Sequence, residues 1–279
     1  MPVPGRIESS PGSRRPFCPR SVASTLVALV SAGIPTAGSE PVFVTEFASP
    51  SGLDLASKLL PNAMRDRLRE LRKRQPFVFP PHVIPDHFRR AAVLIPFWEH
   101  DGEVRVLLTR RAARMSRNAG QISFPGGLLE GDESWQEAAL REAQEEVGLG
   151  RHEVELVGRL DDAWSGTGSH LVPLVGWLDS PPALSANTAE VSEILTPLVR
   201  VLLAPGAISQ QEIVKRGTRY INPIVEWPGA RAYGLSADLL IEALKWAIGD
   251  EIARGPARLA DLESQRDFLI QQSGFSTPA

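Results

Sequence analysis

The sequence predicts an α/β domain in which helices cover a mixed sheet. Two observations lead to this prediction. Apolar runs of strand length alternate along the chain with segments of helical period, and no internal repeat of about 20–50 residues is found. Of the 279 residues, 43% are hydrophobic and 23% are charged, which suits a globular domain of about 150–200 residues with extensions.

The composition argues against several classes of protein. A net charge of −3 is unlike a dedicated nucleic-acid binder, because such domains are usually basic. One cysteine, Cys18, and five dispersed histidines argue against a disulfide framework and a thiolate or histidine metal site. No apolar run reaches the ~18–20 residues of a membrane span. We therefore expect a cytoplasmic protein without stable membrane insertion, and we leave a homodimer open.

Residues 1–50 are rich in Pro, Gly and Ser, and we expect a disordered leader or a start site placed too far upstream. The alternative is a twin-arginine export signal, since Arg14 and Arg15 precede an apolar stretch at 22–34. Nearby prolines and the lack of a clean cleavage site after Ile34 argue against that alternative.

Residues 51–88 combine a basic amphipathic helix with a proline-rich linker. Apolar residues recur near the 3.6-residue period from Leu53 to Arg74, between seven Lys and Arg side chains. We expect this helix to pack on its own domain, and the alternative is contact with a membrane or an anionic partner. The prolines between Pro76 and Pro85 predict the linker.

The compact domain is expected over residues 89–250, followed by a C-terminal helix or tail over 251–279. Asp101-Gly102 predicts a tight hairpin. Ser134 and Glu137 form a capping-box pattern, and Gly148 is a natural stop for the helix that begins there. The expected strands are 91–98, 104–109, 153–160 and 172–178, and the expected helices are 134–147 and 236–248.

Charge is distributed unevenly around a glycine-rich loop. Five arginines and no acid lie between Val104 and Arg117, whereas nine acids accompany only two arginines between Glu130 and Glu155. The segment Phe124-Pro125-Gly126-Gly127 joins the two regions, and its glycines allow close approach of the main chain to a ligand. A cationic stretch followed by an anionic one suits a polyphosphate and its metal ions.

Three acids in the expected helix crowd one face. At ~100° per residue, Glu142, Glu145 and Glu146 fall within an arc of about 100°. Like charges at this spacing repel in water, so a hard divalent cation such as Mg²⁺ would explain why they are tolerated. The alternative is a solvated acidic face that is offset by Arg141.

The residues from Gly127 to Leu149 fit one linear pattern. Gly127 is followed after five residues by Glu133, after seven more by Arg141-Glu142-Ala143, and then by Glu145-Glu146 and Gly148-Leu149. This pattern resembles the signature of the Nudix hydrolases, with Ala143 where a bulkier aliphatic residue is usual. The resemblance implies a Nudix-like α/β/α sandwich with a mixed β-sheet that hydrolyses a nucleoside diphosphate linked to another moiety.

The resemblance also implies roles for the motif residues. Glu142, Glu145 and Glu146 would hold Mg²⁺ or Mn²⁺, and Arg141 and Glu133 would brace the loop. Glu145 is the first choice of proton acceptor and Glu142 the alternative. A fourth acid usually comes from a later loop in this fold; Glu190 and Glu193 are the candidates, and spacing does not choose between them.

The flanking sequence resembles the coenzyme A pyrophosphatase branch of the family. The residues are Leu107-Leu108-Thr109-Arg110-Arg111-Ala112 and then Gly120 with Phe124-Pro125-Gly126-Gly127, and the likeness extends over about 89–248. Ser116 departs from the arginine that is usual in this branch. Coenzyme A carries a 3′-phosphate besides its diphosphate, which an arginine cluster could bind. The expected substrate-binding residues are Arg110, Arg111, Arg114, Arg117, Gly126 and Gly127.

The sequence therefore predicts a metal-dependent hydrolase of a coenzyme A-type nucleotide, with no nucleic-acid partner. Its products would be adenosine 3′,5′-bisphosphate and 4′-phosphopantetheine or a derivative. The alternatives are a Nudix enzyme for ADP-ribose, NADH or a damaged nucleoside triphosphate, and a non-catalytic nucleotide sensor. An isolated histidine, His170, is expected to be structural more readily than to contact substrate.

Overall fold

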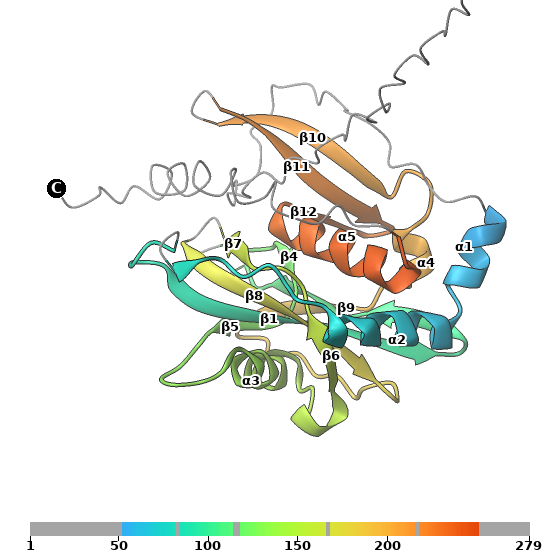
Figure 1. The fold of residues 1–279 in the computed structure, drawn as a ribbon, viewed down its shortest axis with the longest axis horizontal. Coiled ribbons are helices and arrows are strands. Elements are labelled where there is room, and N and C mark those ends of the chain that lie inside the picture. The colour runs from blue at the N-terminus through green and yellow to red at the C-terminus, as the bar shows by residue number, and fades with distance from the viewer. Residues whose placement is uncertain (1–51, 82–83, 114–117, 166–167, 216–217, 251–279) are drawn as a thin grey trace, which may run out of the picture.

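The computed structural model describes residues 52–81, 84–113, 118–165, 168–215 and 218–250 (Figure 1). The leader expected at 1–50 and the tail expected at 251–279 lie outside the described residues. Within the described ranges, no helix is both long enough and apolar enough to cross a membrane.

A mixed six-stranded sheet forms the centre of the fold. Its strands run in the order β2-β1-β8-β6, with β5 paired to β1 and β7 paired to β8. The long central pair β1 and β8 is parallel, and the other pairs are antiparallel. The six strands are β1 (Arg89–His100), β2 (Glu103–Val106), β5 (Gly126–Leu128), β6 (Glu155–Arg159), β7 (Ala163–Ser165) and β8 (Ser169–Leu178).

Both faces of this sheet are covered, because alternate residues of β1 enter two different cores. Ala92 and Leu94 pack with α3 (Trp135–Val147), whereas Ile95 and Phe97 belong to the core that contains α5 (Leu235–Ile248) and α2 (Pro61–Arg69). Figure 1 shows α3 and α5 on opposite sides of the sheet. The predicted α/β/α sandwich with a mixed sheet is confirmed.

Local signals in the sequence identify several of these elements correctly. The Asp101-Gly102 turn closes the β1–β2 hairpin with positive φ at both residues, 53° and 76°. Ser134 and Glu137 form a complete capping box at the start of α3, and Gly148 ends the helix in the left-handed conformation. These features depend on residues close in sequence, which is why the pattern alone finds them.

Two smaller three-stranded sheets complete the described fold. The first contains β3 (Leu108–Arg111), β4 (Ile122–Ser123) and β9 (Val191–Leu195), and the second contains β10 (Ile208–Lys215), β11 (Thr218–Trp227) and β12 (Ala230–Tyr233). The expected single strand at 104–109 is wrong, because the chain leaves the central sheet at Leu107 and enters the first small sheet. Two short helices, η3 (Arg151–Glu153) and α4 (Val199–Leu202), also lie in this part of the chain.

The basic amphipathic segment packs on its own domain. The expected continuous helix is divided into α1 (Gly52–Lys58), α2 and η1 (Glu70–Lys73), with Pro61 beginning α2. Its arginines are used within the domain, since Arg69 and Arg72 both bind the carboxylate of Glu155. Met64 and Leu68 are fully buried in the core that also contains α5.

The proline-rich stretch after η1 is also packed on the domain. Phe79 is buried, and its ring stacks on Trp164 of β7 with 4.0 Å between ring centroids. The backbone N–H of Phe79 donates to the carboxylate of Asp162 at 2.9 Å. The expectation of a linker at 76–85 is therefore wrong for this part of the stretch, because its aromatic side chain contributes to the hydrophobic core.

Candidate active site

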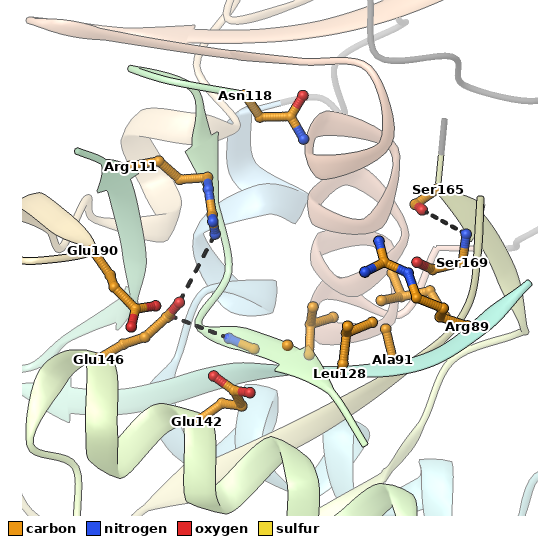
Figure 2. Close-up of a pocket in the computed structure, with 14 residues that line it drawn as sticks. Arg89, Ala91, Arg111, Asn118, Leu128, Glu142, Glu146, Ser165, Ser169 and Glu190 are labelled. Carbon is orange, nitrogen blue, oxygen red and sulfur yellow. Dashed lines mark hydrogen bonds and ion pairs between the residues drawn. The ribbon is translucent and has the colours of Figure 1, made fainter. Parts of the chain in front are cut away.

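A cavity of about 310 Å³ opens where α3, β5 and the first small sheet meet the end of the central sheet (Figure 2). Its floor comes from β1, β5 and β8, and one end is lined by side chains from α3, β3 and the chain before β9. This end carries Arg111, Gly126, Gly127, Glu142, Glu146 and Glu190.

The two glycines of β5 allow the α3 carboxylates to reach the cavity. A Cβ atom on Gly127 would collide with the carboxylate of Glu142. Gly126 has a φ of 154°, and its backbone N–H donates to Oε2 of Glu146 at 3.3 Å. Side chains at these two positions would displace the carboxylates or strain the backbone. Glycine is thus required at 127 by the approach of Glu142, and at 126 by the positive φ and the close packing of β5 on Ala92 and Val93 of β1.

The two carboxylates that α3 contributes to the cavity resist ionisation. The side chain of Glu146 is only 4% exposed, and this burial raises its pKa to about 8 despite Arg111 at 3.9 Å. Burial also raises the pKa of Glu142, although the neighbouring Arg141 opposes the shift. The charge of Glu142 also raises the pKa of Glu146, which lies four residues further along the same helix face. The positive charge of Arg111 and Arg141 is therefore too weak to offset the burial of these two carboxylates.

A divalent cation fits that deficit. Within the described ranges, no three His, Cys, Asp or Glu side chains are gathered closely enough to hold a metal unaided. Two carboxylates at the cavity, with Glu190 on its wall, nevertheless suit Mg²⁺, which takes oxygen ligands and retains several waters or substrate phosphates. Glu142 and Glu146 are the residues best placed to hold such an ion.

Arg141 joins the glycine loop to α3. Its guanidinium donates to the carboxylate of Glu133 at 2.8 Å and to the carbonyl oxygen of Leu128 at 2.9 Å. It also contacts Glu142 and Glu145, each at 3.1 Å. Hydrogen bonding to Arg141 lowers the pKa of Glu133. These contacts agree with the bracing that the sequence suggests for Arg141 and Glu133.

Glu145 occupies a different position from the other two acids of the motif. Its side chain is 56% exposed and is not among the residues that line the cavity. Its contact with Arg141 is the i,i+4 ion pair of a helix surface. The sequence favours Glu145 as proton acceptor, whereas the cavity lining favours Glu142.

The structure separates the residues of two pairs that the sequence treats alike. Adjacent strand residues point to opposite sides, so Arg111 lines the cavity while Arg110 binds Glu193 at 2.7 Å. Glu193 lies opposite Arg110 in the β3–β9 pairing, and Glu190 precedes β9 and lines the cavity. Of the expected arginine cluster, Arg114 and Arg117 lie outside the described residues.

His170 is a structural residue, as the sequence suggests. Its Nε2 lies 2.7 Å from Oδ2 of Asp162, and both side chains are buried. Burial, with Arg159 and Arg90 nearby, lowers the pKa of His170 to about 4, so the neutral imidazole donates its Nε2 proton to Asp162 at neutral pH. The histidine holds β8 against the aromatic side chains of Phe79 and Trp164 and does not line the cavity.

Sequence reasoning missed four polar residues of the cavity lining. Arg89, Ser165 and Ser169 lie at the end of the cavity opposite the glutamates, and Asn118 lies near Arg111 (Figure 2). The period-two alternation of Arg89, Ala91 and Val93 could have indicated Arg89. The serines could not have been found in this way, because their position depends on the pairing of β8 with β1.

Several known proteins are similar to this chain in sequence. A family model described as the NUDIX domain matches residues 87–216. The uncharacterized Nudix hydrolase NudL of Photorhabdus laumondii is 33% identical over 162 residues, which are 58% of this chain and 86% of that protein. The protein of the same name from Citrobacter koseri is 36% identical over 157 residues, covering 55% and 80% of the two chains.

Among solved structures, a MutT/nudix family protein from Enterococcus faecalis matches 81% of this chain and 94% of its own, with a TM-score of 0.38 and 13% identity. The two NudL relatives are more than 30% identical to this chain over most of their own length. The chain belongs to the Nudix hydrolase family, whose activity is the pyrophosphohydrolysis of nucleotide derivatives.

Proposed function

We propose that this enzyme hydrolyses the diphosphate of coenzyme A or its acyl or oxidised derivatives. The proposal rests on which segment of the sequence lines one wall of the cavity. The segment that resembles the coenzyme A branch, residues 107–127, supplies Arg111, Gly126 and Gly127 to the same cavity as Glu142 and Glu146. The products would be adenosine 3′,5′-bisphosphate and 4′-phosphopantetheine or its derivative.

In the proposed reaction, water attacks one phosphorus of the diphosphate and the bridging P–O bond breaks. Bound Mg²⁺ or Mn²⁺ would screen the phosphate charge and lower the pKa of water. Glu142 and Glu146 would hold the ion, with Glu190 on the facing wall. Glu142 would accept a proton from the attacking water, and Glu145 is the alternative acceptor. Arg111 and the backbone at Gly126 and Gly127 would orient the diphosphate.

A bound divalent cation would explain how Glu142 and Glu146 can be ionised near neutral pH although they are buried. Without added positive charge, burial holds the pKa of Glu146 at about 8. A divalent ion favours the ionised form, just as Arg111 does from 3.9 Å. We further propose a cytoplasmic location, which the single cysteine of the chain supports.

A substrate panel tests the proposal. We expect the full chain with Mg²⁺ or Mn²⁺ to hydrolyse coenzyme A with a higher kcat/KM than ADP-ribose or NADH, and mass spectrometry to detect the two named products. Chelation of the metal should abolish turnover, and its return should restore it. A higher kcat/KM for ADP-ribose or NADH than for coenzyme A would overturn the substrate assignment and leave the family intact.

One observation favours that alternative substrate class. Arg110, expected to bind substrate, is engaged by Glu193 at 2.7 Å. Of the expected arginines within the described ranges, only Arg111 lines the cavity. An enzyme for ADP-ribose or NADH would need fewer cationic donors than one for coenzyme A, because these substrates lack a 3′-phosphate.

A further inference from the structure

The cavity has two chemically different ends. The glutamates and the glycine backbone lie at one end, and Arg89 lies with Ser165 and Ser169 at the other (Figure 2). The floor between the two ends is apolar and consists of Ala91, Val93, Leu128 and Leu171. A ligand that fills the cavity would therefore meet a metal-binding end, an uncharged middle and a cationic end.

Strand geometry fixes this arrangement. Arg89, Ala91 and Val93 alternate along β1 and face the same side of the sheet. Val93 pairs with Gly126 of β5, and Arg89 pairs with Ser169 of β8. At about 3.3 Å per residue, the Cα atoms of Arg89 and Val93 are separated by roughly 13 Å. Only the ribose separates the 5′-diphosphate of coenzyme A from its 3′-phosphate, so the long side chain of Arg89 would have to cover the rest of that span.

The guanidinium of Arg89 differs from those of the neighbouring arginines because, among the described residues, it has neither an acidic nor an aromatic partner. Arg90 lies over the ring of Trp135 at 4.9 Å, and Arg159 is bound to Asp162. The backbone N–H of Arg89 donates to the carbonyl oxygen of Gly168 at 3.1 Å, and within the described ranges its guanidinium has no hydrogen-bond or ion-pair partner. The charge of Arg89 is therefore available to a ligand.

Ser169 adds a second donor at the same place. Ser169 is buried, and its backbone N–H donates to the hydroxyl oxygen of Ser165 at 3.0 Å. Within the described ranges, its own hydroxyl has no hydrogen-bond partner, and the residue lines the cavity. A guanidinium and a hydroxyl at one end of a cavity are suitable donors for a phosphate oxygen.

We propose that Arg89 and Ser169 form an anion subsite for a phosphate monoester of the substrate, separate from the diphosphate site. The inference rests on the proposed function, in which that group is the 3′-phosphate of coenzyme A. In this proposal Arg89 binds the 3′-phosphate, a role that the sequence analysis gives to the arginine cluster. It predicts discrimination between nucleotides with and without the second phosphate.

The test compares Arg89→Gln with the matched control Arg90→Gln, whose side chain contacts Trp135 and does not line the cavity. The KM of each protein is measured for coenzyme A and for dephospho-coenzyme A. We expect Arg89→Gln to raise the KM for coenzyme A about tenfold more than that for dephospho-coenzyme A, as for the loss of one charged hydrogen bond. The ratio of the KM for coenzyme A to the KM for dephospho-coenzyme A should be the same in Arg90→Gln as in the wild type.

A second readout separates the subsite from the proposed function. Adenosine 3′,5′-bisphosphate and adenosine 5′-monophosphate are compared as inhibitors of whichever panel substrate the wild type hydrolyses best. We expect the wild type to bind the bisphosphate more tightly and Arg89→Gln to lose that preference. If the wild type does not hydrolyse coenzyme A, the proposed function fails, but loss of this preference in Arg89→Gln still supports the subsite. An unchanged preference in Arg89→Gln, or an equal loss in Arg90→Gln, overturns the subsite.

Discussion

Two groups of buried carboxylates lie within this domain, and their partners differ. Asp161 binds the guanidinium of Arg74 and accepts from the backbone N–H of Phe77 at 2.7 Å. Asp162 binds Arg159, His170 and the backbone N–H of Phe79. Both aspartates receive several donors from the protein itself. Their charges are neutralised at the cost of ordering the segment from Arg74 to Phe79.

The glutamates of the cavity have donors that are more distant or are shared with other carboxylates. Glu146 receives a weak contact from the backbone N–H of Gly126 at 3.3 Å and has Arg111 at 3.9 Å. Glu142 shares the guanidinium of Arg141 with Glu133 and Glu145. Burying an ionised carboxylate without sufficient positive charge nearby is unfavourable in free energy. A protein retains such carboxylates where a bound cation supplies the missing positive charge. The aspartates thus stabilise the fold, whereas the glutamates are suited to bind a ligand.

The largest expected effect is on catalysis at the glutamate end. Glu146→Gln should lower kcat/KM by about 10³-fold, because it removes a charge that holds the metal and phosphate in place. Glu145→Gln should lower it less, since Glu145 is exposed and does not line the cavity. Steady-state kinetics at saturating Mg²⁺ measure both. Near-wild-type activity in Glu146→Gln would contradict the assignment, and an equal loss in Glu145→Gln would restore Glu145 as the proton acceptor.

The second effect concerns stability at the aspartate group. Asp162→Asn should destabilise the protein by about 3–5 kcal/mol, because it breaks an ion pair in which Asp162 is fully buried and leaves the partly buried Arg159 without this charge partner. Urea unfolding followed by circular dichroism measures the change. Glu193→Gln is the control: this exposed pair with Arg110 should contribute less than about 1 kcal/mol. A loss for Asp162→Asn no greater than that of the control would show that the aspartates are not structural.

The third effect is a pH dependence that only the glutamate end should show. Because burial raises the folded-state pKa of Glu146 to about 8, the folded protein binds an extra proton between about pH 4.5 and 8. Without divalent ions, this group therefore lowers stability as the pH rises through that range. Between pH 5.5 and 8.5 its contribution should change by about 3 kcal/mol.

Urea unfolding of the wild type and Glu146→Gln at both pH values, in the presence of a chelator, measures this contribution. The variant should be relatively more stable at pH 8.5 than at pH 5.5, since glutamine remains uncharged. Mg²⁺ should stabilise the wild type at pH 8.5 more than the variant, because it binds the folded carboxylate. A difference between the two proteins that does not vary with pH would contradict the buried-charge account.

Sequence patterns were sufficient wherever the relevant contacts are local. The capping box at Ser134, the turn at Asp101-Gly102 and the helical arc of glutamates each involve residues within a few positions. Their geometry follows from helix and turn periods, which any neighbouring residues must obey. The acidic face of α3 and its position after a glycine loop could therefore be predicted without a tertiary structure.

Tertiary pairing decided which side chains meet in the cavity. Arg110 and Arg111 are equivalent by sequence, and the antiparallel pairing of β3 with β9 directs one to Glu193 and the other to the cavity. The parallel pairing of β1 with β8 brings Arg89 beside Ser169, which is 80 residues away. A one-residue change in register would exchange the faces of a strand, and no local period specifies the register between distant strands. The acidic face of α3 is thus determined by the sequence alone. Strand pairing in the folded protein determines which side chains face it across the cavity.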